Sequence, residues 1–262
     1  MVEILNILVS KGVCFYDKQL SWGAALTEYE EELTMLAPNI IPVFIELNLD
    51  CRYPENSIIV DHHGQKASKY AQTSIEQVAT LLRVKLNRHQ QLISANDKGH
   101  IRAMIALNAT NEEIAQIRQM DRKAQGVTEE DEKNAEISIK NHIEIINGNC
   151  AIVQSLTRHS SCIFDRIYDK FDYVFIYTPK GQLHYSGKGH IVQYLVELYK
   201  KQKTDNKSID FWWGGSLPDY GFFGTDAPLD KQQIKLMFYE IQQLEAINSK
   251  EESKCLEKMA IG

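Results

Sequence analysis

The sequence predicts an α/β protein, in which a parallel sheet with helices on both faces forms the first domain and a smaller α/β domain follows. In the N-terminal half, short apolar runs alternate with segments of helical periodicity, which is typical of parallel strands joined by crossover helices. The composition changes near Asn147-Gly148-Asn149, and further apolar runs follow. The chain of 262 residues is long enough for one or two domains with a sizeable core.

The predicted strands are short apolar runs bounded by polar or turn residues. In the N-terminal half they are Ile4–Val9, Ile40–Glu46, Ser57–Val60 and the weaker Gln91–Ala95. In the C-terminal half they are Cys150–Leu156, Tyr173–Thr178 and Gln182–Ser186. The turn Pro179-Lys180-Gly181 is expected to join the last two.

Several predicted helices begin at a capping box, in which a threonine and an acidic residue three positions later satisfy each other's backbone amides. The pairs are Thr73 with Glu76, Thr110 with Glu113, and the weaker Thr128 with Asp131. We expect the helix after Thr128 to run on towards Gly148. The segments His190–Lys201 and Leu229–Leu244 are also predicted helices, with a polar loop at 202–208 between them.

These elements predict four parts of the chain. We expect a first domain at 1–127, a connecting helix and linker at 128–149, a second domain at 150–228, and a C-terminal helix with a tail at 229–262. The predicted boundary coincides with the change of composition, where asparagine and glycine favour a turn.

The charge balance restricts how the protein could bind a polyanion. Its 29 Lys and Arg against 35 Asp and Glu leave a formal charge of −6, which excludes binding through a generally basic surface. Any nucleotide site is therefore local. No stretch approaches the roughly 18 apolar residues of a membrane span, and the N-terminus lacks the pattern of a signal peptide. We expect a cytoplasmic protein without a membrane partner.

The five cysteines are odd in number and scattered, and no two of them form a C-x-x-C pair. This usage is not typical of a zinc ribbon, a redox motif or a disulfide framework. We interpret the cysteines as small buried hydrophobes.

The most specific chemical feature is Asp61-His62-His63-Gly64, directly after the apolar run that ends at Val60. Open parallel sheets bind ligands at the carboxyl ends of their strands, so two imidazoles and a carboxylate there favour a metal or phosphate site. The alternative is that one histidine caps a turn and the other is solvated. The strand context and the nearby acids favour a site.

Two more acids follow predicted strands. Glu46 ends the second predicted strand, and Asp97 comes just after the fourth. A glutamate at a strand end can be merely solvated, and an aspartate near Gly99 can belong to an ordinary turn. With the Asp-His-His string, however, they make a set of oxygen and imidazole ligands suited to Mn²⁺ or Mg²⁺.

The string Ile-Ile-Val-Asp61-His62-His63-Gly64 resembles the signature of the DHH phosphoesterase superfamily, which includes RecJ-type nucleases, nanoRNases, cyclic-dinucleotide phosphodiesterases and manganese pyrophosphatases. Asp97 matches the family's later metal-binding aspartate, and Glu46 stands where another is expected. The segment from Ser21 to Leu26 (Ser-Trp-Gly-Ala-Ala-Leu) resembles the small-residue helix start of the first motif. Phe211-Trp212-Trp213-Gly214-Gly215-Ser216 resembles the glycine-rich substrate motif of the accessory DHHA1 domain.

The resemblance implies a DHH-like metal-binding domain at 1–127, a DHHA1-like substrate domain at 150–228, and a metal-dependent phosphoesterase or phosphodiesterase acting in the cleft between them. The implied catalytic residues are Asp61, His62 and His63. The implied ligands of Mn²⁺ or Mg²⁺ are His62, Asp97 and Glu46. The implied substrate contacts are His63, Trp213, Gly214, Gly215 and Ser216. The implied partner is a nucleotide or a short single-stranded oligonucleotide, and a homodimer is compatible with the resemblance.

The chain also departs from the family pattern. Two aspartates normally precede the Gly-Ala-Ala segment of the first motif, but Lys18 and Leu20 stand at those places and the one acid, Asp17, is out of register. Ser216-Leu217 replaces the usual glycine-histidine ending of the accessory motif. These departures are consistent with a single-ion enzyme, with an altered reaction, or with a catalytically degenerate protein that binds nucleotide or serves as an interaction partner.

Two segments of the second domain have alternative readings. The indoles of Trp212 and Trp213 could stack on bases, or they could be core residues at the end of a strand whose glycines form a turn. Gly187-Lys188-Gly189-His190 precedes a predicted helix and is a candidate phosphate contact, although four residues are too few to be specific.

Overall fold

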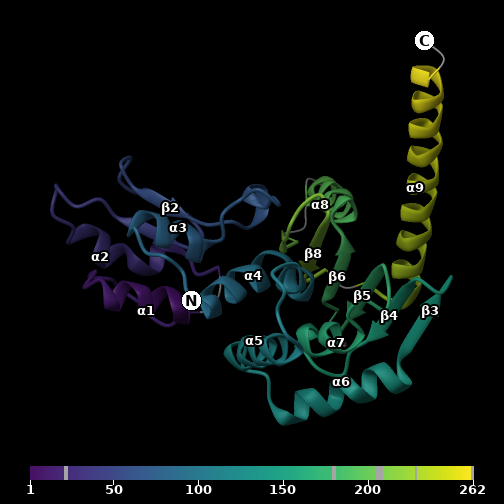
Figure 1. Ribbon diagram of the computed structural model, residues 1–262, viewed down its shortest axis with the longest axis horizontal. Coiled ribbons are helices and arrows are strands. Elements are labelled where there is room, and N and C mark those ends of the chain that lie inside the picture. The colour runs from purple at the N-terminus through teal and green to yellow at the C-terminus, as the bar shows by residue number, and fades with distance from the viewer. Residues whose placement is uncertain (21–22, 179–180, 204–208, 228, 261–262) are drawn as a thin grey trace. The chain divides into compact units, whose positions relative to one another are not determined.

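The computed structural model describes residues 1–20, 23–178, 181–203, 209–227 and 229–260, without the side chains of 202–203 and 247–260. Over these residues the chain is a mixed α/β protein (Figure 1). The α-helices are α1 (Val2–Ser10), α2 (Glu30–Thr34), α3 (Ser74–Leu81), α4 (Arg88–Ala106), α5 (Asn111–Ala124), α6 (Glu129–Asn141), α7 (Ser160–Ile167), α8 (Gly189–Lys203) and α9 (Lys231–Ala260), with the 3₁₀ helices η1 (Leu26–Tyr29) and η2 (Gly64–Lys66). The strands are β1 (Val43–Ile45), β2 (Ile58–Val60), β3 (Ile143–Ile146), β4 (Cys150–Gln154), β5 (Tyr173–Tyr177), β6 (Leu183–Lys188), β7 (Phe211–Gly214) and β8 (Tyr220–Thr225).

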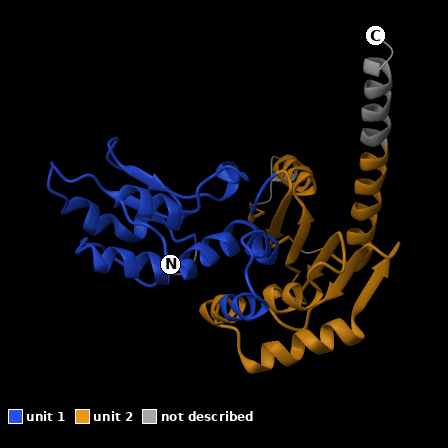
Figure 2. Cartoon of the chain, viewed as in Figure 1, with its two compact units in different colours: residues 1–117, 214–217 blue, residues 118–213, 218–262 orange. Residues whose placement is uncertain are grey.

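The chain divides into two compact units (Figure 2). Unit 1 comprises Met1–Ile117 and Gly214–Leu217, and unit 2 comprises Arg118–Trp213 and Pro218–Gly262. The segment expected as a connector, 128–149, therefore lies inside unit 2. Asn147 and Gly148, both at positive φ, form the turn of an antiparallel hairpin between β3 and β4, so the change of composition there marks a hairpin.

Unit 2 is built on a six-stranded sheet with the strand order β3-β4-β5-β6-β8-β7. Strands β4 and β5 are parallel, whereas the pairs β3–β4, β5–β6 and β6–β8 are antiparallel. The three strands predicted in this half are confirmed as β4, β5 and β6. The turn predicted before β6 includes residues 179 and 180, which lie outside the described part of the chain.

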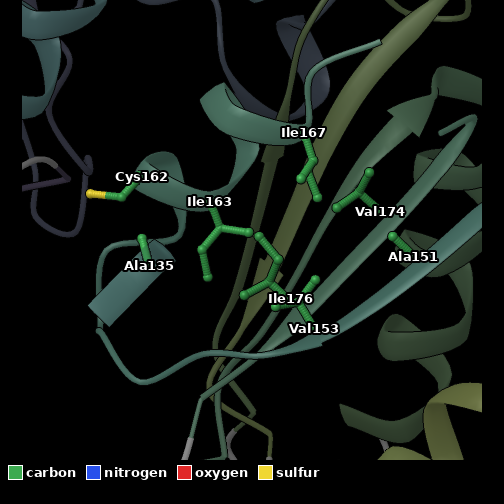
Figure 3. Packing of buried hydrophobic residues seen from close by; sticks show 8 residues of the cluster. All are labelled: Ala135, Ala151, Val153, Cys162, Ile163, Ile167, Val174 and Ile176. Carbon is green, nitrogen blue, oxygen red and sulfur yellow. The ribbon is translucent and has the colours of Figure 1, made fainter. Parts of the chain in front are cut away.

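Helices cover both faces of this sheet. Successive residues of β4 and β5 point to opposite faces, and nearly all of them are buried. On one face, Val153 and Ile176 pack under Ile163 of α7, with α6 beside it (Figure 3). On the other face, Phe175 makes an edge contact with Phe238 of α9, at 6.3 Å between ring centroids. Burial of these apolar side chains is the main favourable term that holds the layers together.

Unit 1 contains a small parallel sheet of β1 and β2, in which Val43 lies opposite Ile58 and Ile45 lies opposite Val60. Its core joins one face of α1 and one face of α3 to β2; the buried residues are Ile4, Ile7, Leu8, Val60, Ile75 and Val78. The larger parallel sheet predicted for this half is absent from the described residues, because two of its four predicted strands are helical.

The first of those strands, Ile4–Val9, is wrong, since these residues lie in α1. A short apolar run does not distinguish a strand from a buried helix by itself. The decisive pattern is the spacing of Ile4, Ile7 and Leu8, which are buried on one helical face.

The fourth predicted strand, Gln91–Ala95, is also wrong, since it lies inside α4. A capping box starts this helix: the amide of Gln90 donates to Asn87 Oδ1 at 2.9 Å, and the amide of Asn87 donates to Gln90 Oε1 at 3.1 Å. The asparagine-glutamine version of the box is the signal that identifies this helix in the sequence.

The helix starts predicted at threonines are confirmed. The amides of Thr73, Thr110 and Thr128 donate to Glu76, Glu113 and Asp131, at 2.8, 2.9 and 2.9 Å. The helix after Thr128 ends at Asn141, however, and the β-branched run that follows forms β3.

The two later helices are confirmed as α8 and α9, but α9 continues to Ala260 through most of the segment expected as a tail. Residues 202 and 203 of the predicted polar loop belong to α8, and 204–208 lie outside the described residues. Within the described part of the chain, no helix is both long and apolar enough to cross a membrane.

The cysteines are buried only in part. Cys150 and Cys162 are buried as expected, but Cys14 is exposed and Cys51 is half-buried, so the expectation of burial is wrong for these two. The side chain of Cys255 is outside the described residues.

Candidate metal centre

The carboxyl ends of β1 and β2 bring the first site residues together. Because the strands are parallel and Ile45 is paired with Val60, the next residues, Glu46 and Asp61, leave the sheet at the same edge. The amide of Glu46 continues the ladder by donating to the carbonyl of Val60 at 2.9 Å. Glu46 has a φ of 57°, a left-handed backbone conformation that residues other than glycine rarely adopt. The predicted position of Glu46 at a strand end is thus confirmed.

Glu46 contacts both histidines through separate oxygens. Its Oε1 lies 3.2 Å from Nδ1 of His62, and its Oε2 lies 2.7 Å from Nδ1 of His63. Ser74, the first residue of α3, donates its hydroxyl to the same Oε1. The two imidazole rings are 4.0 Å apart between centroids.

His62 is the most buried member of the site, with 6% of its surface exposed. Its Nδ1 lies 3.0 Å from the hydroxyl of Ser74 as well as near Glu46. Its Nε2 is buried and has no hydrogen-bond partner among the described residues. The carboxylate oxygen Oδ2 of Asp97 lies 3.3 Å from this nitrogen but does not have hydrogen-bond geometry. A buried imidazole nitrogen in this state is suited to bind a metal ion.

Asp61 supports the neighbouring histidine. Its Oδ1 accepts a hydrogen bond from the amide of His63 at 3.0 Å and lies 3.3 Å from Nδ1 of the same residue. Its Oδ2 faces Lys66 at 3.5 Å. The backbone carbonyl of Asp61 accepts from the side chain of Gln77 on α3 at 3.0 Å, which ties the end of β2 to that helix.

The charges of the cluster stabilise one another. Burial by itself raises the pKa of Glu46, but the hydrogen bonds from His62 and His63 outweigh it, and the pKa lies well below its ordinary value. Burial lowers the pKa of His63, but Asp61 and Glu46 raise it further, to about 10. The pKa of Asp61 is lowered, because the hydrogen bonds from His63 exceed the effect of burial. His63 is therefore cationic at neutral pH, between two carboxylates.

Asp97 reaches the cluster from α4, not from the end of a strand. It comes just before Gly99 and His100, where α4 has non-helical dihedral angles and His100 has φ of 55°. The neighbouring Lys98 donates to the carbonyl of Ala71 at 2.7 Å. The prediction that Asp97 lies near His62 is confirmed by the 3.3 Å separation, although the predicted secondary structure was wrong.

The residues of the first family motif do not join the cluster through any contact described. The carboxylate of Asp17 accepts from the amide of Gln19 at 2.8 Å, in a local turn. Lys18 pairs with Glu32 at 3.0 Å. Residues 21 and 22 lie outside the described part, and η1 begins at Leu26, after Ala25 pairs with Asn48 in an isolated bridge.

The glycine-rich segment has one contact near the site residues of unit 1. Gly214 ends β7, and Gly215 has φ of 117°, which favours glycine at this turn. The hydroxyl of Ser216 donates to the carbonyl of Lys98, next to Asp97, at 3.1 Å. Unit 1 thus includes Gly214, Gly215 and Ser216 among its residues.

The tryptophans lie on β7 in unit 2. The ring of Trp213 stacks on Phe211 at 5.6 Å between centroids. The indole of Trp212 covers the backbone of Gly224 and contacts the ring of His184 edge-on at 5.9 Å. These contacts favour a structural role for Trp212.

The candidate phosphate contact at the start of α8 is already occupied by a carboxylate of this chain. Glu245 of α9 accepts from His190 at 2.7 Å and lies 3.4 Å from Nζ of Lys188. The hydroxyl of Tyr173 donates to the other oxygen of Glu245. This cluster attaches α9 to the sheet.

Ser74 is the site residue that the sequence interpretation missed. Its neighbour Thr73 was identified as a helix cap. The signal that could have revealed Ser74 is a second hydroxyl at the start of the helix that follows the Asp-His-His string. Four residues, Glu46, Asp61, His62 and His63, offer ligand atoms that all lie within 4.8 Å of one another. This arrangement can hold a divalent cation.

Comparison with known proteins identifies no relative: no family model, no curated protein and no solved structure matches the chain. The resemblance to the DHH superfamily therefore depends on the residues of the motifs alone.

Proposed function

We propose that this protein is a metal-dependent phosphoesterase or phosphodiesterase of the DHH type, acting on a nucleotide or a short oligonucleotide. The observation that carries the proposal is the buried Nε2 of His62, which has no hydrogen-bond partner among the described residues and lies 3.3 Å from the carboxylate of Asp97. A buried polar atom left in this state is unfavourable unless a ligand satisfies it.

The donor set fits a divalent cation of the Mn²⁺ or Mg²⁺ type. Imidazole nitrogen and carboxylate oxygen are the ligands that Mn²⁺ accepts, whereas a purely structural zinc site would favour cysteine, and no cysteine belongs to the cluster described. In this proposal, Nε2 of His62 and the carboxylate of Asp97 hold the ion. The ion supplies Lewis-acid stabilisation of the charge that develops on the phosphate oxygens.

The protein's own residues bind and orient the phosphate. His63 is cationic at neutral pH, and in this proposal it donates a hydrogen bond to a phosphate oxygen. A hydrogen bond from a charged donor to an anionic oxygen is stronger than one from a neutral donor. The carboxylate of Asp61 holds His63 in place by accepting a hydrogen bond from the backbone amide of His63 at 3.0 Å. Ser216, Gly214 and Gly215 are the proposed backbone and hydroxyl contacts to the rest of the substrate, and Trp213 is the proposed base contact.

A single ion is expected. Asp17 is engaged in a local turn and is not part of the cluster, so the described residues do not offer the additional aspartates that a second ion would need. Anomalous scattering at the manganese edge from crystals grown with Mn²⁺ counts the ions directly. We expect one bound ion, and the absence of any bound ion would contradict the proposal.

The test of activity uses the full chain with Mn²⁺ and three substrates: a linear dinucleotide, a cyclic dinucleotide and inorganic pyrophosphate. We expect Mn²⁺-stimulated release of product from at least one of them. His62→Ala and Asp97→Ala should each lower kcat/KM by about 100-fold or more. Asp17→Asn is the matched control and should leave activity unchanged. Activity that survives both His62→Ala and Asp97→Ala would contradict the proposal.

A second candidate function is nucleotide binding without catalysis. It is favoured by Lys18, which stands at the place of a family aspartate and pairs with Glu32 at 3.0 Å. In that case a nucleotide would raise the melting temperature of the protein in proportion to the logarithm of its concentration, with no product formed. Hydrolysis that depends on Mn²⁺ and on His62 excludes this candidate.

A further inference from the structure

The contacts of Glu46 differ from those of a carboxylate that is available to a metal ion. Its Oε2 is 2.7 Å from Nδ1 of His63, and its Oε1 is 3.2 Å from Nδ1 of His62. The hydroxyl of Ser74 donates to that same Oε1. Both oxygens of Glu46 are therefore engaged by side chains of the protein.

The triangle of Glu46, Ser74 and His62 determines where the proton of His62 lies. A serine hydroxyl has one hydrogen, and Ser74 gives it to Glu46. Ser74 can then only accept from Nδ1 of His62, which lies 3.0 Å from its oxygen. Nδ1 therefore carries a hydrogen, because an unprotonated Nδ1 would place its lone pair against two oxygen lone pairs. In the neutral imidazole, the lone pair is then on Nε2, the buried atom that faces Asp97.

We propose that Glu46 and Ser74 are positioning residues that orient the two histidines, and that Glu46 is not a ligand of the ion. The inference rests on the proposed metal centre and changes one assignment within it, since the sequence interpretation made Glu46 a ligand. A carboxylate that accepts from the distal nitrogen of a metal-binding histidine fixes the tautomer and orientation of the ring and makes it a better ligand. Ser74 performs the same task for Glu46, by fixing the rotamer of the carboxylate.

The fold holds both positioning residues firmly. Glu46 is held by the ladder bond to Val60 in spite of its left-handed backbone. Ser74 is buried in the first turn of α3, where the capping box of Thr73 and Glu76 fixes the helix start. The hydroxyl of Thr73 in turn contacts that of Ser94 on α4 at 2.8 Å.

Ser74→Ala tests the role of the hydroxyl, and Ser94→Ala is its matched control. Both variants remove one buried hydroxyl from neighbouring helices, but Ser94 is bonded to Thr73 and not to the histidines. Binding of Mn²⁺ to each full-length variant is measured by the loss of the free-ion electron paramagnetic resonance signal. We expect Ser74→Ala to weaken binding by about 10-fold or more, Ser94→Ala to leave it unchanged, and Ser74→Thr to restore it in part. Equal affinity of Ser74→Ala and wild type would overturn the inference.

The tautomer of His62 is a readout that needs no metal. Imidazole ¹⁵N shifts of the protein in EDTA should show His62 protonated at Nδ1, and in Ser74→Ala the two tautomers should become mixed. A wild-type His62 protonated at Nε2 would contradict the inference. If wild type binds no Mn²⁺ but shows the expected tautomer, the proposed function fails and the orientation of His62 by Glu46 and Ser74 stands.

Isotope labelling distinguishes a positioning role of Glu46 from ligation. Glu46 is the only glutamate in the donor cluster described, and the other carboxylates there belong to aspartates. Protein made with ¹³C-carboxylate glutamate should therefore show no strong ¹³C hyperfine coupling to bound Mn²⁺, whereas protein made with ¹³C-carboxylate aspartate should show it. A strong coupling from glutamate would overturn the assignment.

Discussion

Asp97 places a carboxylate oxygen 3.3 Å from Nε2 of His62, at the opposite end of the imidazole from Glu46. In the proposed metal centre the two carboxylates therefore have different tasks, although the sequence interpretation assigned both to the metal. Asp97 is 44% exposed in its side chain, so its replacement should affect the ion more than the fold.

Asp97→Asn should weaken Mn²⁺ binding by about 10-fold or more, while the melting temperature in EDTA stays close to that of wild type. Titration calorimetry measures the affinity, and circular dichroism measures the melting. Asp17→Asn makes the same change of charge in unit 1, at a residue held in a local turn. Equal weakening in both variants would mean that overall charge, and not the position of Asp97, controls binding.

The ion pairs between α5 and α7 should be important for the stability of unit 2. Arg118 is buried and lies 2.9 Å from Asp165, which also pairs with Arg122. Asp165→Ala should lower the free energy of unfolding by about 3–5 kcal/mol, because it leaves buried positive charge poorly compensated. Glu197→Ala, which removes a surface pair with Lys200 on α8, should change it by less than about 1 kcal/mol. Urea unfolding compares the two, and similar small effects would contradict the importance of the buried pairs.

The packing of Trp212 on Gly224 predicts a large effect of one methyl group. A Cβ at Gly224 would overlap the indole ring, so Gly224→Ala has to displace Trp212 or distort β8. We expect the free energy of unfolding to fall by roughly 2–3 kcal/mol and the tryptophan fluorescence to change. At Gly148 a Cβ would have open space, but φ is +74°. Gly148→Ala should therefore lower the free energy of unfolding by only about 1 kcal/mol, through backbone strain. A neutral Gly224→Ala would refute the close contact.

Asp131 should make the stability of the protein depend on acid pH. Burial raises its pKa, but the hydrogen bonds from Thr157 and Thr128 outweigh it and lower the pKa to about 2. A lowered pKa means that the contribution is fully present above the ordinary value near 4 and is lost as the pH falls from about 4 to 2. Asp131→Asn should therefore remove roughly 2 kcal/mol at neutral pH and flatten the acid dependence of urea unfolding. An unchanged slope between pH 4 and 2 would contradict this assignment.

The parts of the site that are local in sequence could be predicted. Asp61, His62 and His63 are consecutive after an apolar run, so their position at a strand end follows from local pattern alone. Glu46 required in addition that its strand be parallel to the next, which the alternation of elements indicated. Asp97 was assigned to the site because it follows a predicted strand, and the family resemblance agreed with this assignment, but the segment that carries it lies in α4.

The missed features depend on contacts that local pattern does not encode. Ile4–Val9 is apolar enough for either a strand or a buried helix, and the helical spacing of Ile4, Ile7 and Leu8 matters because this face packs with α3 and β2. Ser74 looks like any hydroxyl in a first helical turn until the fold brings it to Glu46. The hairpin at Asn147 and Gly148 was interpreted as a boundary, because a tight turn and a linker have similar composition.

If the proposed metal centre is correct, the brevity of β1 and β2 links the folding of unit 1 to its affinity for the ion. Each strand has three residues, and among the described elements they pair only with each other. A slip of one residue in this pairing would move Glu46 away from the level of Asp61 and turn alternate side chains to the wrong face. A cation that bound only the correct register would therefore contribute its binding free energy to the folding of unit 1. In the proposed metal centre, the cation would then act as a folding ligand that selects one strand register over its neighbours.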